Sequence, residues 1–145
     1  MASAMVGEVQ LRTRTIGYYK NHSWHTSVTL CNGEILITED GVVTPEGDST
    51  YNGKEILSNA KNKNISMLVA QLIAAKLNVN NASGVQEYGI AQAEDWLCQQ
   101  DNVVIREGGV VVDFDWDAQY EAGQKGPATA HKDAMDAFNN AFDVD

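Results

Sequence analysis

The segment "ISMLVAQLIAAKLNVNNASG", residues 65–84, constrains the fold more than any other part of the chain. Up to residue 77 its apolar run is interrupted only by Ser66, Gln71 and Lys76, which recur every five residues and so do not share one helix face. A helix that is apolar nearly all round belongs in a protein interior. We therefore predict a central helix that ends within residues 78–84, where asparagine and glycine tolerate the left-handed conformation of helix termini.

Two β-hairpins and further helices are predicted around this central helix. The run "TSVTLCNGEILIT" alternates on both sides of Asn32-Gly33, a dipeptide typical of hairpin turns, which predicts strands near 26–31 and 34–38. A second hairpin is predicted around Gly108-Gly109, and helical patterns occupy residues 51–63, 85–100 and 131–142. The expected fold class is α+β: a helix-dominated single domain, residues 1–145, with a central apolar helix and one or two β-hairpins. Residues 1–14 are either part of it or an added extension.

Charge narrows the range of partners. The formal net charge is −10, and residues 107–145 contain nine acidic residues but only two lysines. A nucleic-acid partner is disfavoured because this surface would repel a phosphate backbone. No apolar run is long enough to cross a bilayer, so no membrane span is predicted. The opening "MASAMVGEV" lacks the pattern of a secretory signal, which suggests a cytoplasmic chain or one from which a signal has been removed.

The segment "GYYKNHSWHTS", residues 17–27, contains two histidines, and these offer a candidate metal site. His22 and His25 are spaced three residues apart, which could bring two imidazoles to one zinc or copper ion on a helical turn. Further ligands must come from elsewhere, and the only other histidine is His131. The alternative is that these histidines hydrogen-bond to loop backbone, which is the more common role.

The same segment can be interpreted as a packing motif. A glycine lets the chain turn, aromatic rings bury large areas against the central helix, and an asparagine and a histidine bond to backbone groups that would otherwise be unpaired. We favour this interpretation over a metal or sugar site. Its residues are Gly17, Tyr18, Tyr19, Lys20, Asn21, His22 and Trp24.

Acidic residues near the second hairpin suggest a calcium site. The stretch "DFDWDAQYEAGQ" places Asp113, Asp115 and Asp117 at alternate positions, as in a calcium loop. It is not an EF-hand, because Ala118 stands where glycine is needed and Gln124 where a bidentate glutamate is needed. A looser calcium site and a solvated strand end remain as alternatives, and no cofactor other than calcium is predicted. The sequence contains no nucleophile elbow, HExxH motif or phosphate-binding glycine loop.

Cys31 and Cys98 are the only cysteines. If they pair, closing this long loop stabilises the fold by roughly 4 kcal/mol on the chain-entropy model. Two buried thiols are the alternative, because no CxxC spacing indicates a redox or zinc site.

Three blocks of the chain resemble a family of secreted and cell-surface proteins, mostly bacterial, with a GYWKNH-type motif near the N-terminus. The blocks are residues 17–22 with Trp24, the "VAQLIAAKLNVNNAS" helix at residues 69–83, and "AMDAFNNA" at residues 134–141. This chain differs in having Tyr19 in place of the family's tryptophan and Ala70 in place of a histidine. The family has no settled activity, so the resemblance implies a setting, extracellular or cell-surface, and no chemistry.

We therefore expect a non-catalytic extracellular or cell-surface structural or adhesion domain, a subunit of a surface assembly. The alternative is a carbohydrate- or calcium-binding module, and the third hypothesis is a metal-dependent hydrolase. Expected partners are a cell-surface protein, a polysaccharide or a second copy of the chain. Self-association is predicted through strand edges in residues 26–38 or 102–114, because unpaired edge amides and carbonyls invite pairing with another chain.

Overall fold

The computed structural model describes residues 13–42, 50–81 and 88–141. They form an α+β fold in which helices dominate, as predicted. In chain order the elements are α1 (Ile16–Asn21), β1 (Ser27–Leu30), β2 (Ile35–Thr38), β3 (Tyr51–Asn52), α2 (Gly53–Ser58), α3 (Ile65–Asn81), α4 (Tyr88–Cys98), β4 (Val104–Glu107), β5 (Val110–Phe114) and α5 (Lys125–Ala141).

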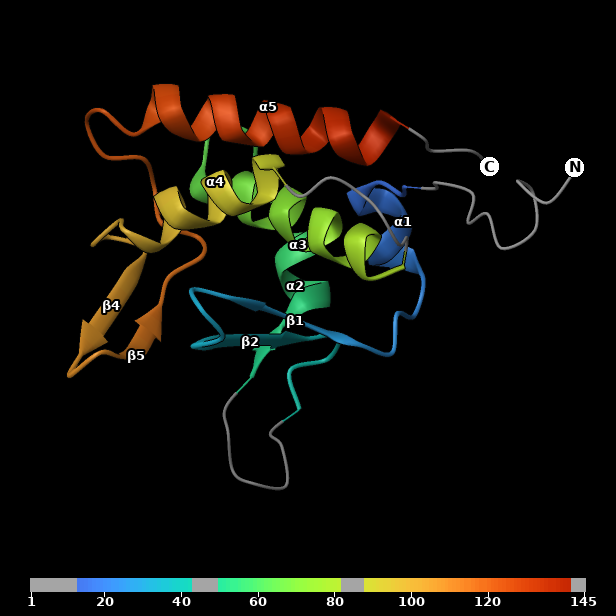
Figure 1. Ribbon diagram of the computed structural model, residues 1–145, viewed down its shortest axis with the longest axis horizontal. Coiled ribbons are helices and arrows are strands. Elements are labelled where there is room, and N and C mark those ends of the chain that lie inside the picture. The colour runs from blue at the N-terminus through green and yellow to red at the C-terminus, as the bar shows by residue number, and fades with distance from the viewer. Residues whose placement is uncertain (1–12, 43–49, 82–87, 142–145) are drawn as a thin grey trace, which may run out of the picture.

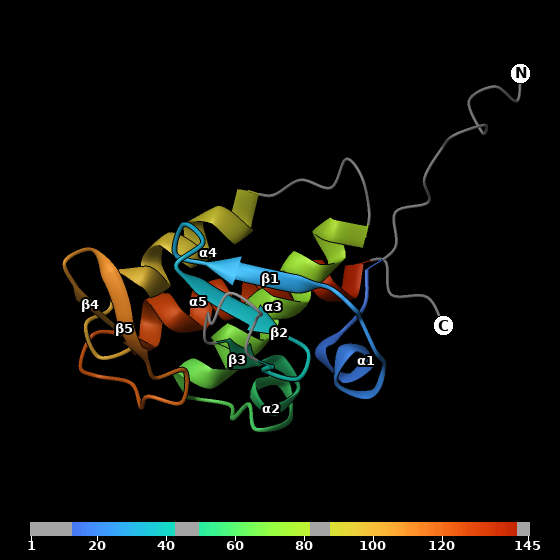
Figure 2. The same ribbon diagram turned by 90° about the horizontal axis from the view of Figure 1, so that it is seen from below.

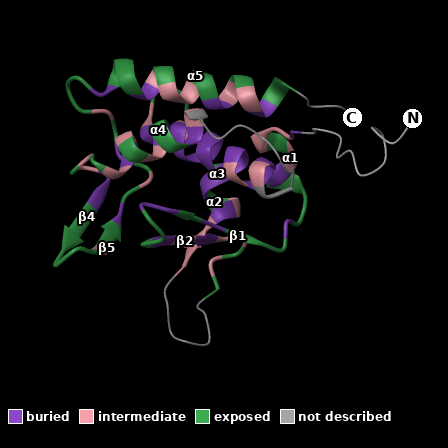
Figure 3. Cartoon of the chain, in the orientation of Figure 1, coloured by how far each residue is buried: buried purple, intermediate pink, exposed green. Residues whose placement is uncertain are grey.

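Helix α3 occupies the centre, as its sequence predicts. It lies beneath α5, beside α4, and above the small sheet formed by β1, β2 and β3 (Figure 1). From Ile65 to Asn78 all its residues are buried except Met67 and Lys76, which are partly exposed. Figure 3 shows the same helix as the most continuously buried element. The helix continues to Asn81, so Asn78 does not end it, and Ser83 and Gly84 lie outside the described residues.

The first sheet contains the predicted hairpin and a third strand that the sequence did not indicate. β1 and β2 pair antiparallel, and the pair nearest the turn is Leu30 and Ile35. In the turn between the strands, Asn32 and Gly33 both have positive φ, as this turn type requires. β3 pairs parallel with β2 and takes up the first two residues of the 51–63 stretch that was predicted as helical. The strand order β1-β2-β3 leaves β1 at one edge.

The second hairpin is confirmed as β4 and β5, joined at Gly108 and Gly109. These strands pair antiparallel as a separate two-stranded sheet with an irregularity between Ile105 and Arg106. Figure 1 shows the hairpin projecting away from the helices. Its base is buried through Phe114, but its outer part exposes apolar side chains.

The N-terminal described residues differ from expectation in two ways. Residues 16–21 form helix α1, with the Thr15 side chain accepting a hydrogen bond from the Tyr18 N–H as N-cap. Gly17 lies inside this helix without a positive φ, so its predicted role in a turn is wrong. Thr13 is fully buried and Arg14 bonds to α3, so these two residues belong to the fold and not to an extension. Residues 1–12 lie outside the described part.

Candidate functional site

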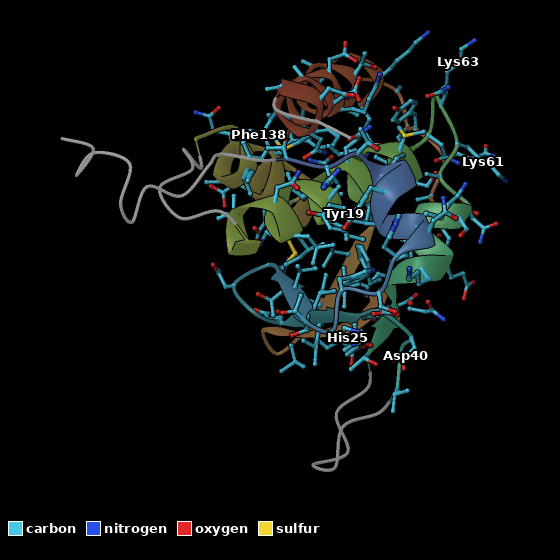
Figure 4. All side chains as sticks on the ribbon, turned by 90° about the vertical axis from the view of Figure 1, so that its right-hand side faces the viewer. Tyr19, His25, Asp40, Lys61, Lys63 and Phe138 are labelled. Carbon is cyan, nitrogen blue, oxygen red and sulfur yellow. A yellow bond between two sulfur atoms is a disulfide. The ribbon has the colours of Figure 1, made fainter. Side chains whose placement is uncertain are left out.

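Tyr19 and Trp24 of the 17–24 motif are buried, as the packing interpretation expects, whereas Tyr18 is half-buried. Tyr19 is 3% exposed and Trp24 is 9% exposed. Tyr19 lies between α1 and α3, whereas His25 lies at the periphery near Asp40 (Figure 4). Trp24 packs against Gly53 so closely that a Cβ there would lie 2.5 Å from the indole ring. Its indole N–H is buried without a hydrogen-bond partner.

A buried polar network starts from Tyr19. Its hydroxyl donates to Asn78 Oδ1 of α3 at 2.5 Å, and Asn78 Nδ2 donates to Asn139 Oδ1 of α5 at 2.8 Å. Asn139 Nδ2 returns to α3, donating to the Gln71 carbonyl at 3.0 Å and to Gln71 Oε1 at 2.8 Å. Gln71 Nε2 then donates to Asp136 Oδ1 at 3.1 Å.

Every polar atom of the Asn78 side chain in this network is satisfied. Besides the Tyr19 hydroxyl, Oδ1 accepts the Arg14 backbone N–H at 2.8 Å, and Nδ2 also donates to the Arg14 carbonyl at 3.0 Å. The Asn78 side-chain amide therefore both accepts from and donates to the backbone of Arg14, which lies just before α1. Fully satisfied buried networks specify one arrangement, because leaving any member unpaired is costly. The network thus fixes α1, α3 and α5 relative to one another.

A second set of contacts holds the segment that follows α1. The Lys54 ammonium of α2 donates to the carbonyls of Tyr19, Lys20 and His22, at 2.9, 3.1 and 2.5 Å. These are carbonyls that a helix end leaves unpaired, and a cation is favourable there because of the helix dipole. Lys54 thus acts as the cap of α1. The sequence did not indicate this cap, because Lys54 lies 35 positions after Tyr19.

The Glu39 carboxylate anchors the chain after that cap. Its Oε1 accepts the backbone N–H of Trp24 at 2.9 Å and of His25 at 3.2 Å. These two hydrogen bonds, the one from Trp24 first, lower the pKa of Glu39 below its ordinary value of 4.5, and the positive charge of Lys54 adds to the effect. Burial of the carboxylate raises the pKa, but its effect is smaller than that of either hydrogen bond. Glu39 stabilises His25 in its left-handed conformation, with φ of 50°.

Tyr18 is the most exposed of the motif's tyrosine and tryptophan rings, and two other side chains contact its ring. The His22 ring stacks on it with centroids 4.1 Å apart and planes 12° apart. The Arg14 guanidinium carbon lies 4.5 Å from the ring centroid. The His22 ring and the Arg14 guanidinium thus cover part of the ring surface on which a sugar could otherwise stack.

The three histidines do not come together. His22 caps the end of α1 and its Nδ1 bonds to the Tyr18 carbonyl at 2.9 Å, while Asn21 bonds to the Gly17 carbonyl. His25 lies beyond the end of α1, exposed and in a left-handed conformation, and not on the same helical turn as His22. His131 lies in α5 with its ring 5.8 Å from Trp96. The predicted spacing on one helical turn is therefore wrong.

The acidic triplet predicted as a calcium site lies at the surface, at the end of β5 and in the turn that follows. Asp113, Asp115 and Asp117 are all exposed, and Asp115 Oδ1 accepts the Asp117 backbone N–H at 3.2 Å. Within residues 13–42, 50–81 and 88–141, no three histidine, cysteine, aspartate or glutamate residues are grouped so that they could hold a metal ion. Asp115 instead helps to shape the turn after β5.

Cys31 and Cys98 form a disulfide, with Cα atoms 5.6 Å apart and a separation of 67 positions in sequence. The bond joins the turn after β1 to the last residue of α4. Noncovalent contacts reinforce this junction: the Cys31 N–H donates to Glu94 Oε2 at 2.8 Å, and Arg106 donates to Glu34 at 3.2 Å and to the Cys98 carbonyl at 2.7 Å.

A groove that sequence reasoning missed lies between β1, the end of α3 and the start of α4. Its volume is about 320 Å³. Val79 and Ile90 supply apolar wall, and Lys76 and Glu94 form an ion pair at the groove. Lys76 also donates to the Thr29 carbonyl of β1. No local motif indicates such a groove, because its lining comes from three separate segments.

No described helix is both long and apolar enough to cross a membrane. The chain matches no family model, no curated protein and no solved structure.

Proposed function

We propose that this protein is a non-catalytic structural domain of the cell surface or the extracellular space, and a subunit of a larger surface assembly. The observation that carries the proposal is the disulfide between Cys31 and Cys98. Structural disulfides persist in oxidising compartments and are rare in cytosolic proteins. Both cysteines of the chain are used in this one bond.

The contacts of the 17–24 motif support a structural role for these residues. The three sequence blocks that resemble the surface-protein family contribute Tyr19, Asn78 and Asn139, and these meet in one buried network. Tyr19 stands where the family has tryptophan, so the resemblance covers Asn78 and Asn139 of this network. These residues hold helices together, as the contacts of a scaffold do.

The experiment that tests the proposal follows the thiols in the source cells. Cells are treated with a thiol-blocking reagent before lysis, fractionated, and the protein is detected by antibody and mass spectrometry. We expect it in the surface or medium fraction, with both cysteines blocked only after prior reduction. Recovery from the cytoplasm with both cysteines blocked directly would overturn the proposal.

A further inference from the structure

The chain contains two Asn-Gly dipeptides, Asn32-Gly33 and Asn52-Gly53. An asparagine before a glycine can lose its side-chain amide without an enzyme. The backbone nitrogen of the glycine attacks the side-chain carbonyl carbon of the asparagine, ammonia leaves, and a cyclic succinimide forms. Glycine favours this attack because it has no Cβ to hinder the approach and restricts the backbone least. Since the two dipeptides are identical, their surroundings decide which of them reacts.

The Asn32-Gly33 dipeptide is unprotected. Both residues are exposed in the turn between β1 and β2. A Cβ at Gly33 would meet no other atom within 4 Å. Among the described residues, none hydrogen-bonds to the Asn32 side chain or to the Gly33 N–H. Figure 2 shows this turn at the end of β1, beside α4. The amide that would be lost and the nitrogen that would attack it are thus both open to solvent.

This turn can also change its backbone conformation locally. Ring closure brings the Gly33 nitrogen onto the Asn32 side chain, so the turn must rearrange for a moment. One backbone hydrogen bond closes it, from the Glu34 N–H to the Cys31 carbonyl at 3.2 Å. Exposed segments with few buried contacts open at a much lower free energy than the whole fold. The reaction at this turn therefore does not require the protein to unfold.

The Asn52-Gly53 dipeptide is protected by its contacts. Asn52 is the N-cap of α2, and its Oδ1 accepts the Glu55 N–H at 3.0 Å. Gly53 is buried, and a Cβ there would lie 2.5 Å from the Trp24 ring. A reaction at Asn52 must break the cap and move the start of α2 away from Trp24. Several contacts are then lost together, which requires a larger opening of the fold.

We infer that Asn32 is a site of spontaneous deamidation in the folded protein and that Asn52 is not. Water opens the succinimide at either of its two carbonyls. One product is aspartate, and the other is isoaspartate, in which the main chain runs through the former side chain. In balance, the amide and one water molecule give a carboxylic acid and ammonia, and no oxidant or cofactor takes part. The inference is independent of the proposed function.

The two products differ in their effect on the turn. The aspartate product adds a negative charge but keeps the turn, because Asp-Gly suits this turn type as Asn-Gly does. The isoaspartate product adds a methylene to the main chain, so the tight turn cannot keep its geometry. The residue before it is Cys31, which forms the disulfide and donates its N–H to Glu94. The modification therefore alters the chain directly beside the junction of the first sheet with α4.

The test compares the two dipeptides within one molecule. The full chain is kept folded in mildly alkaline buffer, which favours deprotonation of the attacking nitrogen, and a second sample is kept in guanidinium with the disulfide intact. Mass spectrometry of peptides from an acidic digest follows the amides of Asn32 and Asn52 over time. Isoelectric focusing of the folded protein follows the added negative charge. The control variant Asn32→Asp carries the product's charge and lacks the reacting amide.

In the folded protein we expect Asn32 to lose its amide at least about tenfold faster than Asn52, because only Asn52 needs a large opening. In guanidinium the two rates should become similar, since the surroundings that separate them are gone. Folded Asn32→Asp should keep its isoelectric point while the wild type shifts toward it. Loss at Asn32 that is no faster than at Asn52 in the folded protein overturns the inference. So does an Asn32→Asp variant that gains negative charge as fast as the wild type.

Discussion

Replacing Asn139 by alanine removes one member of the buried network and leaves the helix that carries it intact. Three hydrogen bonds are lost, one from Asn78 and two to Gln71. At about 1 kcal/mol each, their loss lowers the free energy of unfolding by about 3 kcal/mol. The higher helix propensity of alanine returns about 0.5 kcal/mol. We therefore expect Asn139→Ala to destabilise the protein by about 2.5 kcal/mol.

The next residue provides the control. Asn140 is exposed and its side chain bonds only to Asp136, within its own helix. Asn140→Ala should change the free energy of unfolding by less than about 0.5 kcal/mol. Urea unfolding followed by far-UV circular dichroism measures both variants, and a shift of the midpoint at constant m-value identifies a change in stability. Equal effects of the two substitutions would refute the reasoning, because it attributes the difference in stability to Asn139 belonging to the buried network and Asn140 being exposed.

Four further outcomes follow from described contacts. Trp24→Ala should destabilise by about 3 kcal/mol or more, measured by the same unfolding curves, because it empties the space against Gly53. Lys54→Met should cost about 2 kcal/mol through the three uncapped carbonyls of α1, and unchanged stability would show that solvent replaces the cap. Because the pKa of Glu39 is lowered on folding, its contribution is present above the usual value of 4.5 and is lost as pH falls through the lower folded value, so Glu39→Gln should flatten the acid side of the stability profile. Replacing both Cys31 and Cys98 by serine should cost about 4 kcal/mol, and a much smaller loss would mean that the unfolded chain is already compact.

The elements that could be predicted from the sequence are those determined by residues that are neighbours along the chain. The Asn32-Gly33 turn requires two positive φ values that asparagine and glycine adopt easily, so the first hairpin follows from a dipeptide and its flanking alternation. The central helix follows from an apolar run with no polar face. The disulfide was left open, because spacing alone does not bring Cys31 near Cys98.

The elements that sequence missed depend on distant partners. A six-residue helix has no stability of its own, and α1 exists because Lys54 and Asn78 bind its two ends. β3 is two residues long and exists only as an addition to β2. Asn78 was interpreted as a helix-ending residue because its type favours termini, whereas its position in α3 places it in the core. The polar interruption at Gln71 was the one signal of the network visible in the sequence.

Lys54 has a consequence for the order in which the chain becomes structured. The 17–24 segment leaves the ribosome before the residues that bind it, because Lys54 lies 35 positions after Tyr19 and Asn78 lies later still. Until then α1 has neither end bound, and so short a helix is unstable in water. The helix α1 therefore forms only after the residues that bind its two ends have been made, so its folding is tied to that of α2 and α3.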